Sequence, residues 1–83
     1  MRRYYFDLRY GDEITSDEVG LELPSIERVQ QEAAYSLADM AKDAFRRHHA
    51  VDVAGRQMAI EVRDDDGLVL KARFTFDMDR TRT

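Results

Sequence analysis

The chain contains no cysteine, no tryptophan and a single proline, Pro24. Without cysteine it has no disulfides, no thiolate metal ligands and no cysteine nucleophile. It has no apolar run close to the roughly 20 residues that a membrane-spanning helix needs. Its first residues are charged, so we expect no signal peptide. These absences predict a soluble cytoplasmic protein with no membrane segment.

The chain also has no strong excess of positive or of negative residues. The 83 residues include 13 Lys and Arg and 17 Asp and Glu, which gives a formal net charge of −4. Mixed charge of this kind gives no general attraction to nucleic acid or to anionic membranes. The hydrophobic fraction of 43% is enough for one folded domain over residues 1–83. Within it we expect residues 79–83 to form a frayed tail.

One long helix is predicted from Ser25 to about His49. Pro24 cannot continue a sheet ladder, and Ser25 can cap the exposed amides of a new helix. Apolar residues then recur at three- and four-residue spacing as far as Phe45. A loop is expected over residues 50–55.

Four segments alternate apolar and polar residues, which is typical of strands with one covered face. They are residues 3–10, 19–23, 58–63 and 68–78, and the last of these places Leu68, Leu70, Ala72, Phe74, Phe76 and Met78 inward. Gly20 inside the second strand indicates a bulge or a close backbone approach. Residues 11–18 are expected to form a polar loop.

This order predicts an α+β fold, β-β-α-β-β, with a four-stranded sheet and one helix on one face. If the third strand pairs with the first, the sheet is antiparallel throughout and the strand order is 2-1-3-4. A mixed sheet with the fourth strand beside the first is the alternative. We favour 2-1-3-4, because purely antiparallel sheets tolerate one wet face.

Two clusters could suggest metal, and we interpret both structurally. The acids of Asp64-Asp65-Asp66-Gly67 are consecutive, whereas a calcium loop needs alternate ligands over about 12 residues, so a solvated hairpin turn is predicted. We expect Gly67 to have positive φ. His48 and His49 are adjacent and lack a third ligand. We expect no metal and no cofactor.

The basic run at residues 46–49 lies at the end of the predicted helix, where positive charge is favourable because the helix dipole is negative there. In the predicted topology it lies beside an acidic loop, which we expect to neutralise it. The acids concerned are Asp12, Glu13, Asp17 and Glu18.

The uncovered sheet face interleaves bases with acids and shows one aromatic residue, Tyr5. A sheet that binds single-stranded RNA normally presents several stacking aromatics, so we expect cross-strand ion pairs instead. Nucleic-acid contact is the alternative, and its candidates are Arg3, Arg9, Arg63, Lys71 and Arg73.

No serine, lysine or carboxylate lies in a recognisable nucleophile, acid–base or phosphate-binding motif. We therefore expect a non-enzymatic protein with no catalytic residues and no evident small-molecule pocket.

A difference in length points to self-association. A helix of about 24 residues spans about 36 Å, whereas strands of about eight residues span about 26 Å. The helix should overhang the sheet near Phe45, where the loop through Val51 and Val53 or a second subunit could cover it. The sheet also has two edges. We predict a homodimer or another protein partner, with Tyr5 and Phe45 as candidate contacts.

Three segments resemble a known family: Arg3-Tyr4-Tyr5-Phe6-Asp7, the stretch from Asp17 to Pro24, and the hairpin from Ile60 to Gly67. The chain is similar to small, uncharacterised alphaproteobacterial proteins, typical of rhizobial genomes. The resemblance implies a bacterial stand-alone domain without assigned activity. A looser similarity of fold, to the strand-strand-helix module of HicB-type antitoxins, implies the alternative of a nucleic-acid-associated regulator.

Overall fold

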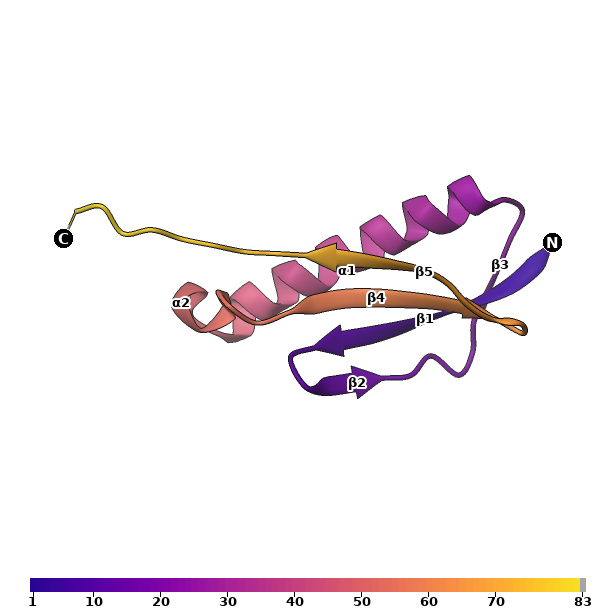
Figure 1. Ribbon diagram of the computed structural model, residues 1–83, viewed down its shortest axis with the longest axis horizontal. Coiled ribbons are helices and arrows are strands. Elements are labelled where there is room, and N and C mark those ends of the chain that lie inside the picture. Colours follow the sequence, from indigo (N-terminus) through magenta and orange to yellow (C-terminus); the bar gives the residue numbers. More distant parts are fainter. Residues whose placement is uncertain (83) are drawn as a thin grey trace.

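The computed structural model describes residues 1–82, and within them one long helix lies across one face of an antiparallel sheet (Figure 1). The elements are β1 (Arg2–Tyr10), β2 (Glu13–Thr15), β3 (Leu21–Leu23), α1 (Ile26–Arg47), α2 (Ala50–Val53), β4 (Met58–Asp64) and β5 (Gly67–Phe74). The strand order is β2-β1-β4-β5, with β3 also paired to β1. The predicted α+β class and the predicted order are confirmed.

The sequence predicted one strand beside β1, over residues 19–23, whereas the structure has two: β3 within that range, and β2, which was not predicted. Both pair antiparallel with β1, β3 opposite its first residues (Arg2↔Leu23) and β2 opposite its last (Tyr10↔Glu13). The expected loop over residues 11–18 was therefore wrong for 13–15. After the turn at Gly11, with φ of 60°, the backbone lies beside the free edge of β1 and gains ladder hydrogen bonds whatever its side chains.

Helix α1 begins where the sequence predicts and ends slightly earlier. The Ser25 hydroxyl accepts a hydrogen bond from the Arg28 amide at 3.2 Å, and His48 is the C-terminal cap. The segment expected to be a loop contains α2. A helix of four residues is too short to be predicted from periodicity. Val53 of α2 is fully buried, so this segment covers part of the overhanging helix end.

The core lies between α1 and β4. Val29 and Ala33 of the helix are almost completely buried, as are Met58, Ile60 and Val62 of the strand. Helix α1 packs on β4 and β5 rather than on β2. The side chains of β1 that face the helix are consequently only half-buried.

The last strand differs from its prediction at both ends. A register shift between Val62 and Arg63 places Leu68 opposite Arg63, so Leu68 lies on the open face and is 67% exposed. At the other end β5 stops at Phe74, because its partner β4 begins at Met58. Beyond it the chain runs on past the sheet (Figure 1).

Candidate interaction surfaces

Ion pairs cross the open face of the sheet, as predicted. The Arg63 guanidinium donates from Nε to Asp7 at 2.9 Å and lies 4.6 Å from the centroid of the Tyr5 ring. Glu61 accepts from Arg9 Nε at 3.1 Å. The hydrogen bond from Arg9 lowers the pKa of Glu61, and although burial opposes this, the ammonium of Lys71 at 3.4 Å lowers it further.

This pairing occupies most of the bases that could contact nucleic acid. Arg3 lies 3.7 Å from Glu22, and Arg9, Arg63 and Lys71 pair as described. Among residues 1–82, Arg73 is the one candidate with no ion pair within 4 Å. The face therefore carries little uncompensated positive charge.

The carboxylate of Asp17 fills the gap between β2 and β3. It accepts hydrogen bonds from the backbone amides of Phe6, Val19 and Gly20 at 3.0–3.1 Å. Burial acts to raise the pKa of Asp17, but the amides of these three residues and the charge of Arg63 hold it below its ordinary value. A side chain thus interrupts the backbone ladder at the middle of this sheet edge.

The backbone amide and carbonyl of Asp17 are also hydrogen-bonded to neighbouring side chains. Its amide donates to Asp7 at 2.9 Å, and Arg63 Nη2 donates to its carbonyl at 2.9 Å. The prediction that Asp17 neutralises the basic helix end was wrong. The reason is that residues 16–20 return along β1, where unpaired amides attract the carboxylate.

Gly20 permits a close approach at the same place. Its φ is 78°, and a Cβ there would lie 2.9 Å from Arg3 Cγ and from Tyr5 Cε1. The predicted close approach is confirmed, although Gly20 precedes β3 rather than lying within a strand. The Tyr5 ring is therefore held between Gly20 and Arg63.

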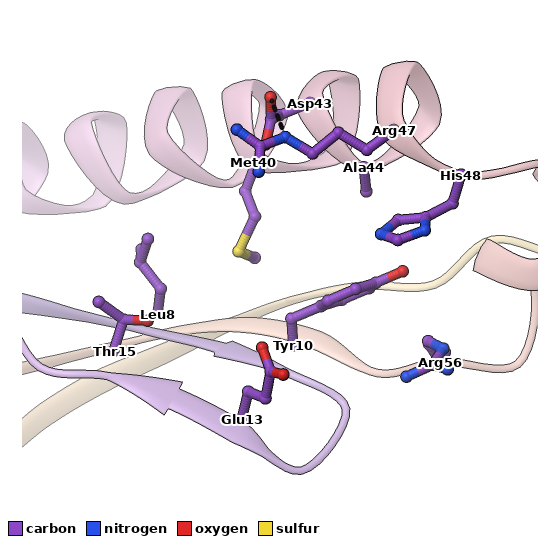
Figure 2. A pocket seen from close by; sticks show the side chains of 10 residues that line it. All are labelled: Leu8, Tyr10, Glu13, Thr15, Met40, Asp43, Ala44, Arg47, His48 and Arg56. Carbon is purple, nitrogen blue, oxygen red and sulfur yellow. Dashed lines mark hydrogen bonds and ion pairs between the residues drawn. The ribbon is translucent and has the colours of Figure 1, made fainter.

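A cleft of about 480 Å³ lies between the end of α1 and the β1–β2 hairpin (Figure 2). The sequence did not predict it. It exists because α1 lies over β4 and β5 and leaves this side of the sheet less covered. Its lining residues are Leu8, Tyr10, Glu13, Thr15, Met40, Asp43, Ala44, Arg47, His48 and Arg56.

The charges in the cleft are mixed. The Tyr10 ring stacks on His48 with centroids 6.1 Å apart, and Arg56 lies 5.6 Å from its centroid. Arg47 pairs with Asp43 of its own helix at 3.1 Å, so the predicted neutralisation by the acidic loop was wrong for this residue. The volume is within the range of small-molecule sites. The cleft is thus lined by apolar side chains and by charges of both signs.

The acidic hairpin is a turn, as predicted. Asp64 accepts from the Asp66 amide at 2.8 Å and from Arg2 at 2.9 Å, and Gly67 has φ of 126°. The Asp66 amide lowers the pKa of Asp64, burial opposes it, and Arg2 lowers it further. Over residues 1–82 no three His, Cys, Asp or Glu side chains are grouped to hold a metal ion.

The two candidate protein contacts both pack inside the chain. Tyr5 is half-buried beneath Arg63. Phe45 meets Phe76 edge to face, with ring centroids 4.8 Å apart. Phe76 and α2 thus cover the overhanging end of the helix, and Val51 remains 75% exposed there.

The outer edge of β5 is the longer of the two sheet edges. It spans eight residues, whereas β2 and β3 span three each. In the described part of the chain no strand lies on its outer side. Lys71, Arg73 and Thr75 are exposed along it, and Asp77 follows.

None of the helices over residues 1–82 is long and apolar enough to cross a membrane.

No curated protein and no solved structure matches the chain. A family described as a domain of unknown function, DUF6894, matches residues 3–77, which cover the observed strands and helices except for Arg2, the first residue of β1. The chain therefore belongs to the DUF6894 family.

Proposed function

We propose that this protein is a small interaction module that acts through the outer edge of β5, and that its partner is a second copy of the same chain. The observation that carries the proposal is the contrast between the two edges of the sheet. One edge is split into β2 and β3 and interrupted by Asp17. The other is a single strand of eight residues, regular from residue 70 to residue 74.

An unpaired strand presents a row of amides and carbonyls that can pair with another chain. Proteins that remain monomeric shorten, twist or interrupt such edges. Asp17 does this for β1, whose amide at Phe6 it occupies. In β5 the register shift lies near Leu68, which leaves residues 70–74 regular. The β5 edge is therefore suited to extending the sheet across a two-fold axis.

The proposed function does not involve catalysis. In the described cleft His48 stacks on Tyr10, and no nucleophile is hydrogen-bonded to it. An antitoxin-like, nucleic-acid-associated regulator is the alternative, and the ion pairs of Arg3, Arg9 and Arg63 weigh against it. A mobility shift with short DNA and RNA over a salt series separates the two, since phosphate contacts weaken steeply as salt rises.

Light scattering on the native protein, from low to high micromolar concentration, tests self-association. The mass should rise to that of a dimer. Thr75→Pro should abolish this, because proline removes an amide and blocks edge pairing. The residue lies beyond the last β4–β5 pair, Met58↔Phe74, so the fold should persist. Thr75→Ala is the matched control and should remain dimeric. A native protein that stays monomeric would contradict the proposal.

A further inference from the structure

We infer that residues 75–79 continue β5 as a strand by pairing antiparallel with β5 of the second copy, with Thr75 on the two-fold axis. This inference rests on the proposed function and adds the register of the interface. It also assigns a role to a segment that has a strand pattern but no neighbouring strand within its own chain.

The pattern of β5 continues beyond its observed end. Thr75 and Asp77 are exposed, whereas Phe76 between them is half-buried against Phe45. This is the alternation of a strand with one covered face. Residues 75–78 have no ladder because β4 begins at Met58, opposite Phe74. A second copy pairing along the outer edge would supply that ladder.

Symmetry restricts the register. In an antiparallel pair related by a two-fold axis, residues at equal distances before and after the axis lie opposite each other. Opposite residues share a face of the sheet, so apolar positions must meet apolar positions. The axis must therefore pass through a single residue of the strand.

The charges along the strand then determine through which residue the two-fold axis passes. An axis at Ala72 would place Lys71 opposite Arg73, and an axis at Arg73 would place that residue opposite itself. Both arrangements oppose like charges, which is destabilising. An axis at Thr75 places Arg73 opposite Asp77 and Lys71 opposite Asp79.

If the axis passed through the residue before or after Thr75, only one of the two bases would lie opposite a carboxylate. An axis at Phe74 leaves Arg73 opposite Thr75, and an axis at Phe76 leaves Lys71 opposite Thr81. Only the axis at Thr75 gives a carboxylate to both bases of the strand. One of them, Arg73, has no ion pair within residues 1–82.

The apolar side of the strand agrees with this register. An axis at Thr75 places Phe74 opposite Phe76 and Ala72 opposite Met78. Met78 is 54% exposed in the single chain and would be covered by the second copy. Because Phe76 already contacts Phe45, the interface would continue the existing apolar layer.

Cysteine cross-linking tests the register, since the chain has no cysteine of its own. Opposite residues of an antiparallel pair have Cα atoms about 4.5–5.5 Å apart, a separation that a disulfide can span. Thr75→Cys should therefore form a disulfide-linked dimer under mild oxidation. Arg73→Cys and Asp77→Cys should each form little alone and should cross-link when mixed.

A charge-reversal series gives a second readout. Arg73→Asp and Asp77→Arg should each weaken the homodimer by about tenfold, because each places like charges opposite one another twice per dimer. An equimolar mixture of the two variants should restore association as a heterodimer. Circular dichroism checks that each variant is folded.

The outcomes separate the two proposals. A dimeric native protein in which Phe74→Cys rather than Thr75→Cys cross-links, or in which mixing restores nothing, would overturn the register and leave self-association standing. A native protein that is monomeric at high micromolar concentration would overturn both.

Discussion

The carboxylate of Asp17 accepts a hydrogen bond from the backbone amide of Phe6 at 3.1 Å. The bond lies midway along β1, between the residues that pair with β2 and those that pair with β3. It satisfies a backbone donor without supplying a strand, so this edge cannot accept another chain along its length. The fold therefore leaves β5 as its one long free edge within residues 1–82.

Replacing Asp17 by alanine should destabilise the fold by about 1–3 kcal/mol, because three backbone amides lose their acceptor. For a domain of this size each kcal/mol corresponds to about 4–8 °C in Tm. Urea unfolding measures the change. Glu18→Ala, at the exposed neighbouring position, is the control and should change stability little. Equal losses in the two variants would contradict the role of Asp17.

Stability should fall in acid. The pKa values of Asp17, Glu61 and Asp64 are lowered in the folded protein. The stabilisation from a depressed pKa is complete above the unfolded values, 3.8 for Asp and 4.5 for Glu, and is lost as pH falls through the folded values. Urea midpoints should therefore decline below about pH 4.5. Asp17→Asn should show a shallower decline, and a midpoint that rises toward pH 3 would refute this explanation.

Gly20→Ala should lose more stability than Gly55→Ala. Both glycines have positive φ, 78° and 86°, so both variants carry the cost of about 1–2 kcal/mol for that conformation. Only at Gly20 would the new Cβ also meet Arg3 and Tyr5 at 2.9 Å, whereas nothing lies within 4 Å of it at Gly55. Thermal unfolding of both variants isolates the cost of the close approach. Similar losses would mean that Gly20 is needed for its backbone alone.

Phe45 and Phe76 should be energetically coupled. Their edge-to-face contact at 4.8 Å predicts a coupling energy of about 0.5–1.5 kcal/mol in a double-mutant cycle of alanine substitutions. The cycle is measured at low protein concentration, so that self-association does not enter the comparison. Additive losses would show that residue 76 does not pack on the helix in the single chain.

Much of this fold could be predicted from periodicity. Pro24 and Ser25 mark the start of α1, and alternation identifies β1 and β4 and the face that each buries. The split edge could not be predicted, because β2 depends on a backbone position beside β1 rather than on its own side chains. Leu68 was misplaced because a register shift reverses the faces of a strand without leaving a pattern.

The candidate surfaces were predicted less completely. The ion pairs of Arg63 and Glu61 follow from alternation and strand order, which place opposite charges side by side. The cleft at Tyr10 depends on where α1 crosses the sheet, which periodicity does not fix. The pattern of residues 75–78 was interpreted as a strand, but a strand also needs a neighbour, and β4 begins only at Met58, opposite Phe74.

Amide hydrogen exchange measured by NMR at low and high protein concentration tests the account most directly. If β5 pairs with a second copy, the outward-facing amides of residues 70–78 should exchange slowly at high concentration and rapidly when the protein is dilute. The amides of β4, which are paired within the chain, should be protected in both. Rapid exchange throughout residues 75–78 at the highest concentration would contradict the account.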